Sequence, residues 1–246
     1  AGEQVFAAWS DGRGTDDLSF TVYLAEAGTE PGPWTVEPIP GAPSDAPSRV
    51  RIAAGAGRLH VVYNAGSESR PDIWYTSRPL TGSVWSSATI AYTATATYGS
   101  WAPAVAISPD GQTLHLVWEE RNRAIDRSIM YMSGTITDTG VNWHRPAVKL
   151  STGVALPTWP TVAVDGGGGV HVAYGEQVQG VLPGQCQPLL NQYVRYIGRT
   201  PAGSWMASSV RIDASPMCVN ASIPRDLAPR LLVTGRGNPE ICALWH

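Results

Sequence analysis

The chain has 246 residues, a formal net charge of -3 and only 15% charged residues, and its basic residues form no cluster. This composition excludes the electrostatic footprint of a nucleic-acid-binding protein. The 26 glycines and 20 prolines, with tryptophan and tyrosine far outnumbering phenylalanine, favour many short strands joined by tight turns over helices.

The chain opens on Ala-Gly-Glu without a charged-then-apolar leader, and no apolar run approaches the roughly 18 residues that span a bilayer. We therefore expect no membrane span. We expect instead a secreted or extracellular protein from which any signal peptide has been removed.

The first predicted element is an alternating apolar strand that ends in an aromatic residue, and this pattern recurs four more times along the chain. The five strands cover residues 4–9, 58–63, 113–118, 169–174 and 240–245, and they end at Trp9, Tyr63, Trp118, Tyr174 and Trp245. They follow one another about every 55 to 70 residues, and a repeat of this length indicates units that must stack on their neighbours to bury their faces.

Three further strands complete each unit. After the strand that ends in an aromatic residue comes a polar loop and another strand, at residues 20–26, 72–78, 128–134 and 193–199. An outer strand opens at Trp34, Trp85, Trp143 and Trp205. An inner strand, at residues 48–55, 103–111, 160–168 and 229–237, leads through a turn into the next unit. Four antiparallel strands in a repeated meander predict an all-β fold, a β-propeller with four recognisable four-stranded blades plus a half blade.

The predicted propeller forms one domain over residues 1–246, either whole or as part of a larger propeller. Because the chain begins and ends on the same kind of strand, its terminal edges are exposed to pairing. We expect residues beyond this sequence or a second chain to complete the ring, with self-association through these edges. Within the chain, the inner strand at residues 229–235 is the candidate to pair with the first strand, 4–9.

Residues that recur in register on strands with neighbours on both faces are predicted to be buried. They are Val105, Ile107, Leu116, Val162, Val164, Val172, Tyr75, Tyr131 and Tyr196. The histidines His60, His115 and His171 also recur in register, which indicates packing in three separate blades rather than one metal site. We expect no metal and no cofactor, because the Asp-rich segments 11–17 and 108–113 lack the spacing of a calcium loop, and the second predicts a tight turn.

Polar loops follow the strands that end in aromatic residues, and in a propeller they meet the loops before the inner strands around one mouth of the central channel. Concave mouths of this kind are default binding sites. The candidate ligand residues there are Asp11, Arg13, Arg49, Asn64, Trp101, Glu119, Glu120, Arg121, Trp159, Glu176 and Arg230, with Arg49 and Arg230 at one repeat position. Arginine grips carboxylates and indole stacks on sugar faces, so the ligand would be a glycan or another acidic partner. The alternative is a set of solvated loops with internal ion pairs such as Glu120 with Arg123.

The three cysteines lie in the last third of the chain. Cys186 and Cys218 fall in loop segments, and a disulfide between them would pin the long insertion at residues 175–192. Cys242 falls in a strand and is expected to be a buried apolar residue.

One loop carries a resemblance to a known family. Residues 137–143 read TDTGVNW, and Asp138, Gly140 and Trp143 match the Asp-x-Gly-x-x-Trp spacing of the Asp-box of sialidase-like propellers. The chain thus resembles the sialidase-like or Asp-box (BNR) propellers, with degenerate repeats, and the family's Asp-box is structural and lies far from its active site.

The resemblance allows two functions. The first is an extracellular, non-catalytic binding or scaffold propeller for a glycan or a protein partner. The alternative is a sialidase-type glycoside hydrolase, for which Arg49, Arg121 and Arg230 are the candidate arginines. The Arg-Ile-Pro motif of true sialidases is absent, since residues 223–225 read IPR, and this favours the first function.

Overall fold

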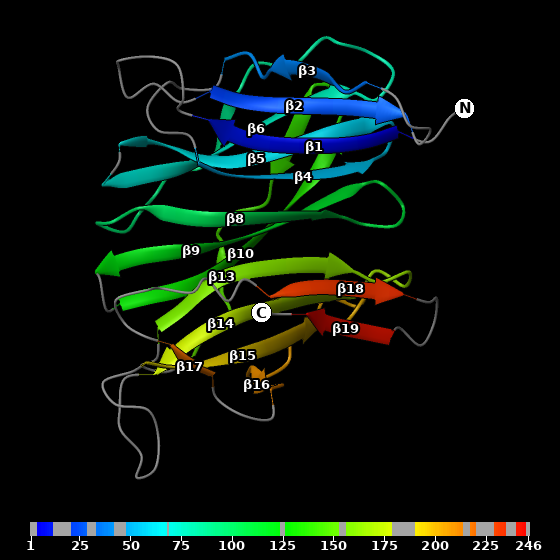
Figure 1. Ribbon diagram of the computed structural model, residues 1–246. Helices are drawn as coiled ribbons and strands as arrows, with labels where there is room; N and C mark the ends of the chain where they lie inside the picture. The colour runs from blue at the N-terminus through cyan, green and yellow to red at the C-terminus, as the bar shows by residue number, and fades with distance from the viewer. Residues whose placement is uncertain are drawn as a thin grey trace.

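The computed structural model describes residues 4–11, 21–28, 33–41, 48–67, 69–123, 126–152, 156–178, 190–213, 217–219, 229–234 and 240–244. These residues form antiparallel sheets that follow one another in chain order, from the blue sheet at the N-terminus to the red hairpin in Figure 1. Among them no helix is long and apolar enough to cross a membrane.

Three complete sheets lie in the middle of the chain. The first contains β4 (Ser48–Gly55), β5 (Arg58–Ser67), β6 (Arg70–Pro79) and β7 (Thr89–Tyr92) in that order. The second contains β8 (Ser100–Ile107), β9 (Thr113–Arg123), β10 (Asp126–Thr137) and β11 (Gly140–Trp143), with β12 (Val148–Lys149) also on β10. The third contains β13 (Leu156–Val164), β14 (Val170–Val178), β15 (Leu190–Arg199) and β16 (Val210–Arg211), with β17 (Met217–Val219) also on β15.

The sheets at the two ends of the chain have fewer strands. The first contains β1 (Gln4–Asp11), β2 (Thr21–Gly28) and β3 (Thr35–Pro38). The last is a hairpin of β18 (Arg230–Thr234) and β19 (Glu240–Leu244). The predicted all-β fold with four-stranded antiparallel sheets is therefore confirmed, while the number of blades stays a prediction.

Tight turns connect the inner strands to the next strands, as the sequence indicates. At the turn from β8 to β9, the Gly111 amide donates to the Ser108 carbonyl at 2.9 Å and the Ser108 hydroxyl donates to Asp110. Gly111 has a φ of 71°, and a Cβ there would lie 3.1 Å from the Cβ of Ala56 in the neighbouring turn. Glycine is thus required both by conformation and by space.

The outer strand β3 begins at Thr35, directly after Trp34, as predicted, but the other outer strands do not open at the tryptophans. Trp85 precedes β7, Trp143 ends β11, and Trp205 forms an isolated bridge with Arg199 before β16. In the second complete sheet the outer edge is split between β11, which pairs with the last four residues of β10, and β12, which pairs with its middle at Met130 and Tyr131. Gly134 allows this, since a Cβ there would lie 2.4 Å from Val141.

The core consists of apolar clusters between consecutive sheets, so the sheets of β4 to β7 and β8 to β11 each bury both faces. Among the predicted core residues, Val105, Leu116, Val162, Val172, Tyr75 and Tyr131 are buried as expected. Ile107, Val164 and Tyr196 are only partly buried. Tyr196 differs from Tyr75 and Tyr131 because each of those rings has an edge contact with a tryptophan of the next sheet, Trp143 at 5.8 Å and Trp205 at 4.9 Å.

The recurring histidines serve packing in three separate sheets, which confirms that prediction. The Nδ1 atoms of His60, His115 and His171 lie 2.9, 2.8 and 2.8 Å from the hydroxyls of Tyr75, Tyr131 and Tyr196. In the third pair, the His171 Nε2 also lies 2.9 Å from Asp165. Burial raises the pKa of Asp165, but the hydrogen bonds from His171, Gly169 and Gly167 outweigh it and lower the pKa overall.

Two predictions about the C-terminal strands are wrong. The inner strand β18 pairs with β19 and not with β1, since Arg230 lies opposite Leu244 and Thr234 opposite Glu240. Cys242 is exposed rather than buried, because β19 has no third strand beside it among the described residues. Cys186 and the Cys218 side chain lie outside the described residues, so their disulfide stays a prediction.

Self-association through the terminal sheets can be tested directly. Exposed fractions of 44% at Val5, 57% at Leu232 and 65% at Leu244 place apolar side chains at the surface of both terminal sheets. Because exposed apolar strands favour pairing with another chain, we expect a mass above that of the monomer in light scattering at high concentration. The double variant Val5→Lys with Leu244→Lys should restore the monomer mass, and a parent chain that is monomeric at every concentration would contradict the prediction.

Candidate functional site

The inner strands of all three complete sheets bulge at the same repeat position. The pairing of β4, β8 and β13 with the next strand shifts at Arg49, Ala102 and Trp159. These residues have φ values of 58°, 47° and 52°, in the left-handed region that costs a non-glycine residue about 1 kcal/mol or more. Bulges redirect side chains and recur beside functional sites, so this end of the inner strands is the candidate site.

The bulged residues bring distant sheets into contact. The Arg49 guanidinium lies 3.6 Å from the centroid of the Trp159 ring. Arg49 belongs to β4 and Trp159 to β13, and the sheet of β8 to β11 lies between them in chain order. A contact that skips a sheet requires the inner edges to converge, as the blades of a propeller do around their axis.

Two further arginines lie where these inner strands converge. Arg51 and Arg230 line one small cavity together with Trp159, Pro160 and Thr161. Burial lowers the pKa of Arg51, and the positive charges of Arg230 and Arg49 lower it further. Within the described part of the chain, neither Arg51 nor Arg230 forms an ion pair with a carboxylate. The cavity is therefore a place of concentrated positive charge beside an indole.

The register corrects one prediction about these arginines. Arg51 lies opposite Val62, and Arg230 lies opposite Leu244, and both partners directly precede the aromatic residue of their strand. Arg51, and not Arg49, thus shares the repeat position of Arg230. Sequence pattern did not single out Arg51, because the bulge adds a residue to β4 and so shifts the two-residue alternation of inward and outward side chains.

A buried carboxylate forms the second part of the mouth. Glu119 is fully buried, and its Oε1 accepts from Arg121 Nε at 2.6 Å and from Arg127 at 3.1 Å. The Arg121 guanidinium also lies 4.6 Å from the Trp101 ring centroid. The Glu119 Oε2 atom has no hydrogen-bond partner. Sequence reasoning found Glu119, Arg121 and Trp101 but missed Arg127, which follows a loop of irregular length.

The neighbouring Glu120 is held by donors from its own chain. Its carboxylate accepts from the amides of Thr95 and Ala96, from the Ser100 hydroxyl and from Trp118 Nε1. These hydrogen bonds hold the segment that connects β7 to β8. Glu120 therefore supports the fold, and these contacts replace the ion pair with Arg123 expected in the alternative.

The remaining predicted residues have other neighbours or lie outside the described residues. Glu176 is buried and accepts from Arg195 Nε at 2.7 Å. Asn64 is buried opposite Ser48 at the start of β4. Arg13 and the Asp11 side chain are not among the described residues. Within those residues, no group of three or more histidine, cysteine, aspartate or glutamate side chains is arranged to hold a metal ion.

Comparison with known proteins finds similarity in structure only. No protein family and no curated protein matches the sequence. Among solved structures, the chain is similar to an α-L-arabinofuranosidase from Lactobacillus brevis, with a TM-score of 0.57 and 11% identity over 81% of this chain and 70% of that one. It is also similar to Trypanosoma rangeli sialidase in complex with 2,3-difluorosialic acid, with a TM-score of 0.53 and 12% identity over 84% of this chain.

The chain has a sialidase-like propeller fold. It spans about a third of the Trypanosoma sialidase, of which 35% is covered. In a sialidase-like propeller the inner strands surround the axis, and this explains how Arg49, Arg51 and Arg230 from separate sheets reach one place. At this level of identity the similarity establishes the fold alone.

Proposed function

We propose that the chain is a secreted sialidase-like propeller that binds an acidic glycan at the mouth, through Arg51 and Arg230, without cleaving it. The observation that carries the proposal is the convergence of Arg51, Arg230 and Arg49 beside Trp159. Guanidinium groups bind a sugar carboxylate in a bidentate geometry, and an indole packs against the apolar face of a sugar ring. A carboxylate would also relieve the repulsion among three neighbouring arginines.

The carboxylates of the mouth favour binding over hydrolysis. Glycoside hydrolysis needs one carboxylate as acid and a second group as base or nucleophile. Glu120 and Glu176 are both buried and accept hydrogen bonds from their own chain. Their position in intact internal networks supports a binding role.

Hydrolysis is the second candidate, and one observation favours it. The Glu119 Oε2 atom is buried and has no hydrogen-bond partner, and the carboxylate lies beside Arg121, which contacts Trp101. This oxygen is an acceptor that the fold leaves unused, and a sugar would reach it once the side chains that cover Glu119 move aside. Fluorogenic sialoside and arabinofuranoside substrates test this candidate, and turnover that Glu119→Gln abolishes would establish hydrolysis.

The binding proposal is tested with two arginine variants and a control. A glycan array should retain acidic glycans, and calorimetry with the best of them should show at least about tenfold weaker binding for Arg51→Gln with Arg230→Gln. The reason is the loss of charge-assisted hydrogen bonds, each worth about 1.5 to 3 kcal/mol. Arg211→Gln is the matched control. Arg211 is an exposed arginine on β16 that pairs with Asp213, and it does not belong to the strands of Arg51 and Arg230. Equal affinity of the double variant and the parent would contradict the proposal.

A further inference from the structure

A second, larger cavity lies between the first sheet and the sheet of β4 to β7. Its volume is about 450 Å³, and its lining includes Glu26, Glu37, Arg78, Thr35 and Ser83. None of its lining residues belongs to the cavity at Arg51 and Arg230. Small-molecule sites in proteins have volumes of about 300 to 1,000 Å³, so this cavity is large enough for a ligand.

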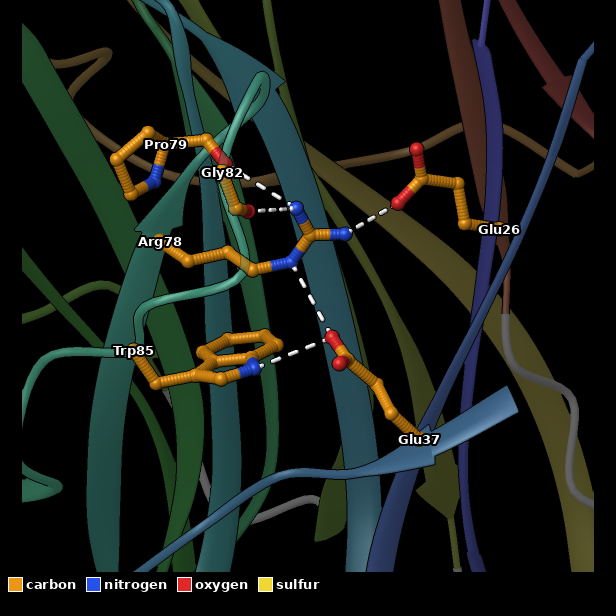
Figure 2. Close-up of polar contacts among 6 residues, drawn as sticks. All are labelled: Glu26, Glu37, Arg78, Pro79, Gly82 and Trp85. Atoms are coloured by element: carbon orange, nitrogen blue, oxygen red, sulfur yellow. Dashed lines mark hydrogen bonds and ion pairs between the residues drawn. The ribbon is translucent and has the colours of Figure 1, made fainter. Parts of the chain in front are cut away.

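Arg78 forms the rigid wall of this cavity. Figure 2 shows its guanidinium held between backbone carbonyls of its own loop and two carboxylates of the other sheet. It donates to the carbonyls of Pro79 and Gly82 at 3.1 and 2.5 Å and to Glu26 Oε2 at 2.5 Å. Since Arg78 is only 3% exposed, these contacts fix the group in one orientation.

Glu37 lies beside Arg78 in the wall of the cavity. Its Oε1 accepts from the Trp85 indole nitrogen at 3.2 Å and lies 3.4 Å from the Arg78 Nε. That 3.4 Å contact is an ion pair without a hydrogen bond, so the buried Nε–H of Arg78 has no acceptor. The cavity therefore contains a fixed, buried donor that a ligand oxygen could satisfy.

The charges around the cavity select the class of ligand. Two carboxylates and one guanidinium lie within ion-pair distance, so an anion would be close to Glu26 and Glu37 and a cation close to Arg78. A sugar hydroxyl both donates and accepts, so neighbouring hydroxyls can donate to the carboxylates and accept from the arginine. Leu24 and Leu80 line the cavity as an apolar surface for the ring carbons.

We propose that the cavity lined by Glu37 and Arg78 is a binding site for a neutral sugar residue, separate from the mouth. The ligand would be held through vicinal hydroxyls. The site differs in its chemistry from the group of Arg51 and Arg230, which have no ion pair among the described residues, because this cavity has arginine and carboxylates together. The proposal does not rest on the function proposed for the mouth.

Saturation-transfer NMR and calorimetry with the methyl glycosides of glucose, galactose, mannose and arabinose test the proposal. Thr35→Trp should abolish binding by filling the cavity, because Thr35 lines it as the exposed first residue of β3. Thr89→Trp is the matched control, since Thr89 is the exposed first residue of β7 and does not line the cavity. Glu37→Gln should weaken binding by about tenfold, since it removes a charged acceptor but keeps the shape of the side chain.

The outcomes separate this site from the mouth. Binding of a neutral glycoside that Thr35→Trp abolishes, and that Thr89→Trp and Arg51→Gln leave unchanged, would support the proposal. Three results would overturn it: no neutral glycoside bound at millimolar concentration, binding that Thr35→Trp leaves intact, or tighter binding of butylamine or acetate in the same cavity. Urea unfolding of each variant ensures that a loss of binding does not come from a loss of folding.

Discussion

Replacing Trp118 with alanine should lower the free energy of unfolding by about 3 to 5 kcal/mol. Trp118 is fully buried in the cluster between the sheets of β4 to β7 and β8 to β11. Its ring centroid lies 4.4 Å from that of Tyr92, and its Nε1 donates to Glu120 at 2.9 Å. The substitution would leave a large cavity and remove one donor from a buried carboxylate.

Urea unfolding monitored by circular dichroism measures this loss. Trp34→Ala is the matched control, because Trp34 is 49% exposed and its loss should change stability by no more than about 0.5 kcal/mol. The difference between the two tryptophans is the expected signature of stacked sheets. Equal effects of both substitutions would contradict the packing between these sheets.

Acidification from pH 7 to pH 4 should destabilise the protein by several kcal/mol through two buried histidines. Burial, with a smaller effect of Arg58, lowers the pKa of His60 from 6.5 to about 4, and burial with Arg199 does the same for His115. The folded state therefore binds fewer protons than the unfolded state between these values, so stability falls as the pH falls from 6.5 to 4. Each histidine contributes about 3 kcal/mol over this window.

The double variant His115→Phe with Tyr131→Phe should remove about half of this pH dependence, because it replaces one of the two hydrogen-bonded pairs by apolar rings. Urea unfolding at a series of pH values provides the measurement. His144→Gln is the control, since His144 is exposed and belongs to neither buried pair. If the double variant kept the pH dependence of the parent, buried histidines would not be the cause of the lost stability at acidic pH.

Local sequence pattern was enough to predict the repeated strands, their order and most of their buried residues. Alternation of apolar residues has a period of two, and one buried face fixes which residues point inward. The aromatic residues Tyr63, Trp118 and Tyr174 and the histidines three residues before them were therefore readable from pattern alone, although β5, β9 and β14 continue beyond the aromatic residues that were predicted to end them. Burial differed where a neighbouring sheet is incomplete, as at Tyr196 and Cys242.

The tertiary structure alone decided which side chains meet. The bulges at Arg49, Ala102 and Trp159 are backbone features of non-glycine residues, and no composition signal marks them. Because the bulge in β4 shifts its register with β5, Arg51 and not Arg49 corresponds to Arg230. The contact between Arg49 and Trp159 and the group of Glu26, Glu37 and Arg78 depend on distances between sheets. Local periodicity determines strands because their hydrogen bonds and faces are local properties, whereas a site between sheets depends on how separate sheets pack.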